Sequence, residues 1–311
     1  MPKTQTKSFK DSLWPGLILK GLIRLFSWMP YWLIQKVGTA IGYLLIWLPN
    51  SHKTIAQKNL KVAYPNLNAS EQHQLVKQTL IALGKVTSEL GAAWCWRYEH
   101  LQPLLKEVKG QHLLDEAIAQ KKGIIFLAPH MGNWELIGPI VSAQHAATFL
   151  YRPPNIPSVE SFMVNARGRF GANLAPTNLR GVRTLIKALN HQEATVILPD
   201  QDPGASGGVY APFYGRPART MTLVSKLIQK TDSTVLFMVL KRLPDAQGFC
   251  LHYLAADPEI ASSNELKATT ALNRGVERCI QLAPEQYLWS YKRYRKPPKT
   301  MEDIYKKTKR A

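Results

Sequence analysis

The sequence predicts an α/β protein with a mostly parallel central sheet flanked by helices, and an N-terminal membrane-associated helical segment. Apolar strand-like runs alternate with amphipathic helical patterns from about residue 120 onward, which is typical of parallel βαβ units. An aromatic-rich apolar stretch comes before them. At 311 residues the chain can form one large domain with an appendage. We therefore expect a membrane anchor over residues 1–50 and a globular domain over residues 51–311.

The N-terminal stretch of residues 13–49 has the composition of a membrane-interface segment. Lys20, Arg24 and Lys36 interrupt it, so no charge-free run reaches the ~18 residues of a clear spanning helix. Either the first helix lies in the interface, or it spans once with Lys20 and Arg24 extending towards the basic side. Tryptophan gathers at membrane interfaces because its ring is apolar and its N–H is polar. The stretch holds Trp14, Trp28, Trp32 and Trp47.

The charge balance predicts an anionic partner. The chain has 40 Lys and Arg and 21 Asp and Glu, which gives a formal charge of +19 and a pI of about 9.8. Such a charge favours an anionic membrane, a phosphorylated or acidic carrier, or a nucleic acid. The three cysteines are widely scattered, which fits neither a disulfide framework nor a zinc site and favours a reducing compartment.

The remaining elements follow from hydrophobic periodicity. Strands are expected at residues 123–128, 147–151, 194–199, 234–240 and 249–255. Helices are expected at residues 51–64, 68–96, 133–144, 158–170, 181–191, 221–231 and 264–282. Because ligands of such sheets bind beyond the carboxyl ends of the strands, polar residues directly after these strands are candidate site residues.

The segment GIIFLAPHMGNWE, residues 123–135, gives the sharpest functional signal. His130 and Glu135 lie about 140° apart on one helix, so they can meet only if the chain bends at Met131-Gly132. Gly132 permits the bend, Asn133 is a good N-cap, and Glu135 then falls in the first helical turn. The segment predicts a general base, His130, oriented by Glu135. The alternative is a satisfied histidine and an ordinary capping glutamate.

Arginines provide candidate anion contacts. Arg152 follows the second strand, and Arg167 and Arg169 flank a glycine at the end of the helix expected over residues 158–170. Guanidinium groups bind phosphates bidentately, although basic residues at a helix C-terminus can merely complement its dipole.

Two carboxylates, Asp200 and Asp202, follow the third strand. They could bind Mg²⁺ or position an arginine, but Asp-Pro-Gly is also ordinary turn chemistry, so Asp200 is the better candidate. Further along, Arg219 could hold an anion and Thr220 could cap the next helix. A G-x-S-x-G match at residues 204–208 lacks the strand and helix flanks of a hydrolase nucleophile. No pair of histidines has the spacing of a zinc protease, and we expect no metal.

Several motifs together resemble the late acyltransferases of bacterial lipid A biosynthesis. These are the lauroyl and myristoyl transferases, distant relatives of the glycerophosphate and lysophospholipid acyltransferases. The resemblance covers nearly the whole chain, including the aromatic N-terminus, and the motifs occur in the family's order. They are HMGNWE with its H-x4-E spacing, YRP, RGRFG, DQDPG, FYGRPART and WSYKRYRKPP.

The resemblance implies a bacterial inner-membrane enzyme whose catalytic domain, residues 51–311, lies on the cytoplasmic side. It would transfer a fatty acyl chain from acyl carrier protein to a hydroxyacyl chain of a lipid A precursor, with no cofactor, metal or nucleic acid. The family's motifs imply catalytic roles for His130, Glu135, Arg167 and Asp200. Candidate substrate-binding residues are Asn133, Arg152, Arg169, Asp202, Arg219 and Thr220.

Two alternatives stay open at this point. The first keeps the chemistry but changes the acceptor to a lysophospholipid or a glycerophosphate. The second is a membrane-tethered polyanion-binding protein without chemistry, which predicts salt-sensitive DNA binding that does not depend on His130.

Overall fold

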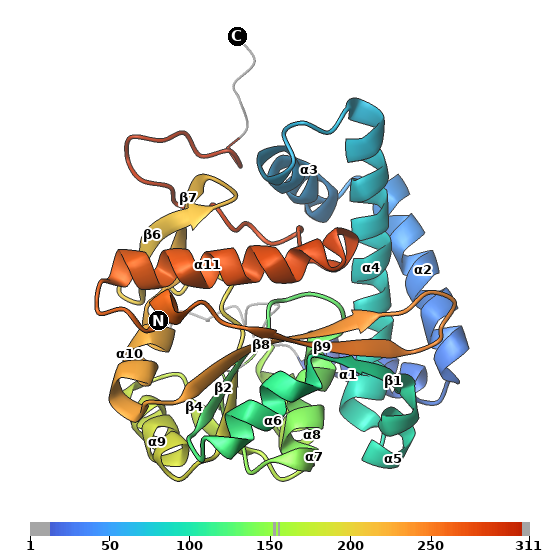
Figure 1. Ribbon diagram of the computed structural model, residues 1–311. Helices are drawn as coiled ribbons and strands as arrows, with labels where there is room; N and C mark the ends of the chain where they lie inside the picture. The colour runs from blue at the N-terminus through green and yellow to red at the C-terminus, as the bar shows by residue number, and fades with distance from the viewer. Residues whose placement is uncertain (1–12, 152–153, 155, 307–311) are drawn as a thin grey trace, which may run out of the picture.

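A mixed sheet forms the centre of the molecule (Figure 1). The computed structural model describes residues 13–151, 154 and 156–306. The sheet has five strands in the order β1-β9-β8-β2-β5, and neighbours pair in parallel except β8 and β9. The strands are β1 (Leu105–Lys109), β2 (Ile124–Leu127), β5 (Ala194–Ile197), β8 (Thr234–Arg242) and β9 (Phe249–Ala255). The prediction of a central sheet flanked by helices is confirmed.

Two smaller strand pairs complete the β-structure. The parallel pair β3 (Thr148–Tyr151) and β4 (Asn173–Pro176) continues the sheet past β5, where Ala194 N–H donates to the Ala146 carbonyl at 2.8 Å. The antiparallel hairpin β6 (Gly208–Phe213) and β7 (Arg216–Met221) stands apart from the sheet.

Helices cover both faces of the sheet. Figure 1 shows α11 above the sheet and α6, α7 and α8 below it. Side chains alternate along β2, so that Ile125 and Leu127 join the core with α11, and Ile124 and Phe126 join the core with α6 and α7. These helices are α6 (Gln111–Ala119), α7 (Ile137–Gln144), α8 (Glu160–Gly168), α9 (Leu179–Asn190), α10 (Leu223–Thr231) and α11 (Glu265–Gln281).

The N-terminal third is helical. α4 (Ala69–Cys95) begins with the capping box of Asn68 and Glu71. α2 (Tyr31–Trp47) packs against α4. The other helices here are α1 (Leu13–Ser27), α3 (Ser51–Ala63) and the short α5 (Tyr98–Leu101). Single 3₁₀ turns are η2 (Gln102–Leu104), η3 (Trp134–Leu136), η4 (Pro157–Val159), η5 (Pro258–Ala261) and η6 (Pro284–Gln286).

The expected strands and helices are present with small shifts at their ends, but the sequence did not predict β1, β4, β6, β7, α5 and α6. The prediction that Thr220 caps a helix is wrong: Thr220 lies in β7, and Thr222 occupies the N-cap position of α10. The hairpin of β6 and β7 replaces the expected loop because Tyr214-Gly215 turns the chain back with both residues at positive φ.

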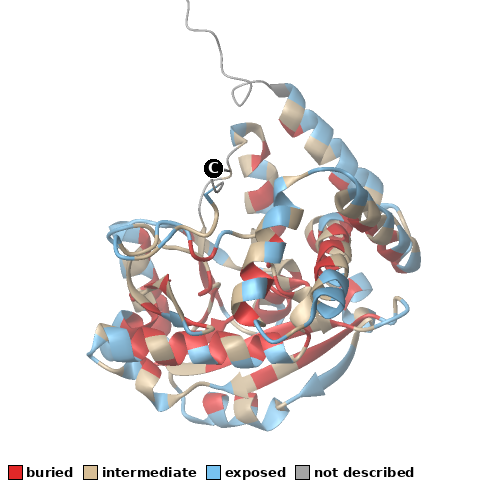
Figure 2. Ribbon diagram, turned by 90° about the horizontal axis from the view of Figure 1, so that it is seen from above, coloured by how far each residue is buried: buried red, intermediate tan, exposed pale blue. Residues whose placement is uncertain are grey.

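Apolar side chains remain exposed on α1 and α2. Figure 2 shows α1, which follows the grey N-terminal trace, largely in the colour of exposed residues. Trp28, in the turn between the two helices, is 80% exposed, and Trp47 at the end of α2 is 75% exposed. Within the described residues no helix combines the length and the apolar character that crossing a membrane requires.

Glycines bring α2 and α4 close together, and this contact is testable. A Cβ on Gly84 would lie 2.2 Å from the Gly38 carbonyl oxygen, whereas a Cβ on Gly21 of α1 would meet nothing within 4 Å. Gly84→Ala should lower the free energy of unfolding by about 1–3 kcal/mol through overpacking. Gly21→Ala should raise it by up to about 1 kcal/mol through helix propensity. Urea unfolding of both variants checks this, and equal effects would contradict the packing.

Candidate active site

A turn at the carboxyl end of β2 carries the histidine singled out from the sequence. The chain bends at Gly132, which has a φ of +57°, and a Cβ there would lie 1.9 Å from the Leu240 carbonyl oxygen. Asn133 caps η3 by accepting a hydrogen bond from Leu136 N–H at 3.3 Å, and Glu135 lies in this first turn. The predicted bend, cap and helix start are confirmed.

Asp200, and not Glu135, orients the imidazole. His130 Nδ1 lies 2.8 Å from Asp200 Oδ1, and His130 backbone N–H donates to Asp200 Oδ2 at 3.0 Å. The strand register explains this contact. Leu127 of β2 pairs with Ile197 of β5, and His130 and Asp200 each come three residues after their own member of that pair. The expectation that Glu135 holds the ring is therefore wrong, since a neighbouring strand supplies the carboxylate.

The environment of Asp200 keeps it ionised. Burial alone would raise the pKa of this carboxyl group, which is 2% exposed. The charge interaction with His130 and the hydrogen bonds from its ring and backbone outweigh burial, so the pKa of Asp200 lies below its ordinary value. An ionised Asp200 requires a proton on Nδ1, which leaves the lone pair of a neutral imidazole on Nε2. There, Gln201 Nε2 lies 3.0 Å away.

Glu135 makes a separate ion pair. Its Oε1 accepts from Arg167 Nη2 at 2.7 Å, and its Oε2 accepts from Trp94 Nε1 at 3.0 Å. Burial opposes ionisation, but the Arg167 charge and these hydrogen bonds hold the pKa of Glu135 below its ordinary value. The structure thus brings together four predicted residues, His130, Glu135, Arg167 and Asp200.

A cavity of about 410 Å³ opens beside these groups. Its polar end has His130, Glu135, Arg167 and Gln201, and most of its remaining wall is apolar. Such a cavity suits an apolar chain with a reactive polar end. The apolar lining includes Trp134, Pro139, Phe149, Leu150, Leu174, Val196, Ile197, Leu198, Met221 and Leu223.

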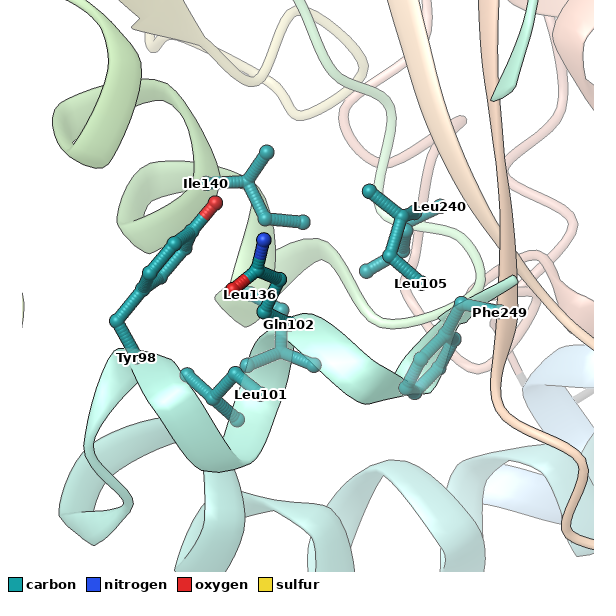
Figure 3. Close-up of a pocket in the computed structure, with 8 residues that line it drawn as sticks. All are labelled: Tyr98, Leu101, Gln102, Leu105, Leu136, Ile140, Leu240 and Phe249. Atoms are coloured by element: carbon teal, nitrogen blue, oxygen red, sulfur yellow. The ribbon is translucent and has the colours of Figure 1, made fainter. Parts of the chain in front are cut away.

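A second cavity lies on the far side of η3 and has a different character. It holds about 20 Å³, the space of one water molecule. Figure 3 shows its lining side chains gathered from helices and strands that meet there. They are Tyr98, Leu101, Gln102, Leu105, Leu136, Ile140, Leu240 and Phe249. Leu136 of η3, the turn that carries Glu135, and Ile140 of α7 both line this cavity.

The other candidate residues support the fold around the site. Asp202 accepts from Arg295 Nε at 2.7 Å and from Gly204 N–H at 2.9 Å, so it ties the C-terminal segment to the turn after β5. Arg169 donates to the backbone carbonyls of Ala93 and Trp96, and burial lowers its pKa to about 10. Arg152 lies outside the described residues.

Two further candidates lie in β7. Arg219 Nη2 donates to Tyr210 Oη at 2.7 Å. Thr220 is fully buried, and its hydroxyl bonds to Asn273 and Arg293. Each of these side chains has internal partners, and the substrate-binding roles expected of Asn133, Asp202, Arg169, Arg219 and Thr220 stay predictions.

Sequence reasoning missed two residues of the site. Gln201 adjoins Asp200 at the strand end, and the rule that strand C-terminal ends carry the site would have found it. Trp94 lies in the last turn of α4, 41 residues before Glu135, and no sequence signal connects the two.

A buried carboxylate–imidazole pair whose histidine lines a mostly apolar cavity is an arrangement that can activate a hydroxyl or a water beside an apolar chain. The model of the bacterial lipid A biosynthesis acyltransferase family matches residues 1–296. The chain belongs to this family and is an acyltransferase, which contradicts the alternative of a polyanion-binding protein without chemistry.

Lipid A biosynthesis acyltransferases of known name are similar to this chain over nearly its whole length. The lipid A biosynthesis lauroyltransferase of Escherichia coli (strain K12) is 27% identical over 308 residues, which are 98% of this chain and 99% of the relative. The palmitoleoyltransferase of the same organism is 29% identical over 293 residues, 94% of each chain. A lipid A biosynthesis acyltransferase of Haemophilus influenzae is 26% identical over 302 residues, 96% of each chain.

The bend at Gly132 should be indispensable. Gly132→Ala combines positive-φ strain of about 1–3 kcal/mol with the clash against Leu240, so it should lower the melting temperature and abolish turnover. Gly171→Ala is the matched control because Gly171 also has positive φ, +91°, but a Cβ there would meet nothing within 4 Å. Thermal melts of both variants check this, and similar losses would contradict a steric role for Leu240.

Proposed function

We propose that this acyltransferase moves a fatty acyl chain from the thioester of acyl carrier protein to the hydroxyl of an acyl chain on a lipid A precursor. One observation carries the proposal: His130, hydrogen-bonded to buried Asp200, lines a mostly apolar cavity. The family supports the lipid A precursor as acceptor.

In the proposed mechanism, the acceptor hydroxyl replaces Gln201 at His130 Nε2. Nε2 takes the hydroxyl proton while the oxygen attacks the thioester carbonyl carbon. The C–S bond then breaks, and the leaving thiolate recovers the proton from the imidazolium. Asp200 holds the ring and stabilises the imidazolium, as the carboxylate does in a Ser-His-Asp system.

Glu135 and Arg167 take a different part. Arg167 donates one N–H to Glu135, and its side chain is one-third exposed. The remaining guanidinium N–H groups can stabilise the oxyanion that forms at the thioester carbonyl, or hold a phosphate of the acceptor. Glu135 fixes the direction of the guanidinium.

The exposed apolar side chains of α1 and α2 support contact with a membrane surface, and the proposed location is the inner membrane with the catalytic domain on the cytoplasmic side. We propose that this face lies in the lipid interface, where the net charge of +19 favours anionic lipid. Substrates with fatty tails would then reach the cavity from the membrane surface. The face comprises Trp14, Leu17, Ile18, Leu25, Trp28, Trp32, Leu44 and Trp47.

Turnover of purified variants tests the roles of Asp200 and His130. Asp200→Asn and His130→Ala should each lower kcat by about 10²-fold or more, because the base is lost or loses its orientation. Asp232→Asn is the control and should keep kcat near that of the wild type, since Asp232 is exposed and pairs with Lys122. The assay supplies acyl carrier protein thioester and lipid A precursor. Wild-type turnover by Asp200→Asn would contradict the mechanism.

The same assay tests the acceptor. A lysophospholipid or a glycerophosphate in place of the lipid A precursor should give at most a small fraction of the turnover. A faster reaction with either would replace the proposed acceptor and leave the chemistry unchanged.

Vesicle flotation tests the interface. The triple variant Trp14→Ser/Leu17→Ser/Ile18→Ser should bind anionic phospholipid vesicles at least about tenfold more weakly, because each side chain loses apolar transfer energy. The control is Ile118→Ser/Leu266→Ser, which changes exposed apolar residues on α6 and α11. If both variants bind like the wild type, α1 does not form the membrane contact.

A further inference from the structure

An ion pair buried behind the active site joins α4 to the end of β8. Arg242 Nε donates to Glu89 Oε1 at 2.7 Å and Arg242 Nη2 donates to Glu89 Oε2 at 2.6 Å. The two side chains are only 3% and 1% exposed. Burying two charges carries a large desolvation penalty, and an apolar pair of similar volume often gives equal or greater stability. Stability alone is therefore a weak reason for this pair.

The pair reaches directly into the turn between His130 and Glu135. Asn133 Nδ2 donates to Glu89 Oε2 at 2.9 Å, and Arg242 Nη2 donates to the Gly132 carbonyl at 3.3 Å. Gly132 is the residue at which the chain bends, and Asn133 is the N-cap of η3. Both partners of the ion pair therefore hold the bend.

Backbone hydrogen bonds attach the turn to the end of β8 and to η6. Asn133 N–H donates to the Leu240 carbonyl and Gly132 N–H donates to the Gln286 carbonyl, both at 3.1 Å. The Gln286 side chain in turn exchanges two hydrogen bonds with the backbone of Arg242, at 2.9 and 3.0 Å. The end of β8 and η6 thus form one support for the bend, and the ion pair ties that support to α4.

We propose that Glu89 and Arg242 are positioning residues for the acyl transfer. They fix Gly132 and Asn133 so that His130 and Glu135, on either side of the bend, face the cavity together. Glu89 and Arg242 act only through the turn. This inference rests on the proposed function, because the groups they position are its base and the carboxylate that fixes Arg167.

The first test replaces the pair by apolar residues of similar length. Glu89→Met/Arg242→Met removes both charges, but it leaves the side-chain donors of Tyr31, Gln35 and Asn133 without their acceptor. We therefore expect a folded protein with a lowered melting temperature. Misplacing a catalytic group by about 1 Å can lower the rate about 10²-fold. We therefore expect kcat to fall at least about tenfold with little change in KM. Wild-type kcat in this folded double variant would overturn the proposal.

Tyr31→Phe is the matched control. Tyr31 Oη donates to Glu89 Oε1 at 3.2 Å from α2, away from the turn. This variant removes a hydrogen bond from the same buried cluster and should leave kcat unchanged. A loss of kcat equal to that of the double variant would show a general effect of the cluster and would overturn the proposal.

A second pair of variants tests the contact by rescue. Asn133→Asp keeps the cap on Leu136 N–H but places a carboxylate against Glu89, so kcat should fall at least about tenfold. Adding Glu89→Gln restores a donor towards residue 133 and the original net charge, and kcat should recover to within about threefold of the wild type. No recovery in the double variant would overturn the proposal.

A measurement without substrate separates this inference from the proposed function. If the wild type itself does not turn over the thioester and lipid A precursor, the proposed function fails. The positioning is then measured as the rate at which diethyl pyrocarbonate modifies His130, followed by peptide mass spectrometry. Glu89→Met/Arg242→Met should change this rate at least twofold and Tyr31→Phe should not. An unchanged rate in the double variant would overturn the positioning role.

Discussion

The hydrogen bond between His130 and Asp200 is the contact on which the rest of the site depends. It follows from the parallel register of β2 and β5, in which Leu127 pairs with Ile197 and each is followed three residues later by one partner. Buried Asp200 stays ionised because His130 lowers its pKa. The ring is thereby oriented with Nε2 towards the cavity, and the other groups are arranged around that nitrogen.

The two buried carboxylates of the site have different partners and therefore different tasks. Asp200 contacts the imidazole, whereas Glu135 contacts Arg167 and Trp94. Both pKa values are lowered despite burial, that of Asp200 by its interactions with His130 and that of Glu135 mainly by the charge of Arg167. The cavity lining thus has two groups with separate tasks. His130 can take up a proton, and the free N–H groups of Arg167 can donate to an oxyanion or a phosphate.

Much of the fold could be predicted from sequence because the apolar strand runs and the helix periodicities are local. The bend at Gly132 and the cap at Asn133 were predictable for the same reason. The partner of His130 was predicted incorrectly because Glu135 is near in sequence, whereas Asp200 is near only through strand register. The hairpin of β6 and β7 was missed because each strand contains a proline and neither is a continuous apolar run. The Glu89–Arg242 pair joins residues 153 positions apart, beyond the reach of any local pattern.

The protonation of the two His130 nitrogens tests the central claim most directly. Nitrogen-15 NMR of protein with labelled histidine distinguishes protonated from unprotonated ring nitrogens, and a His130→Gln spectrum assigns the signals. Under conditions in which the ring is neutral, the account predicts a proton on Nδ1 and none on Nε2, with this preference weakened in Asp200→Asn. A neutral ring that carries its proton on Nε2 in the wild type would contradict the account.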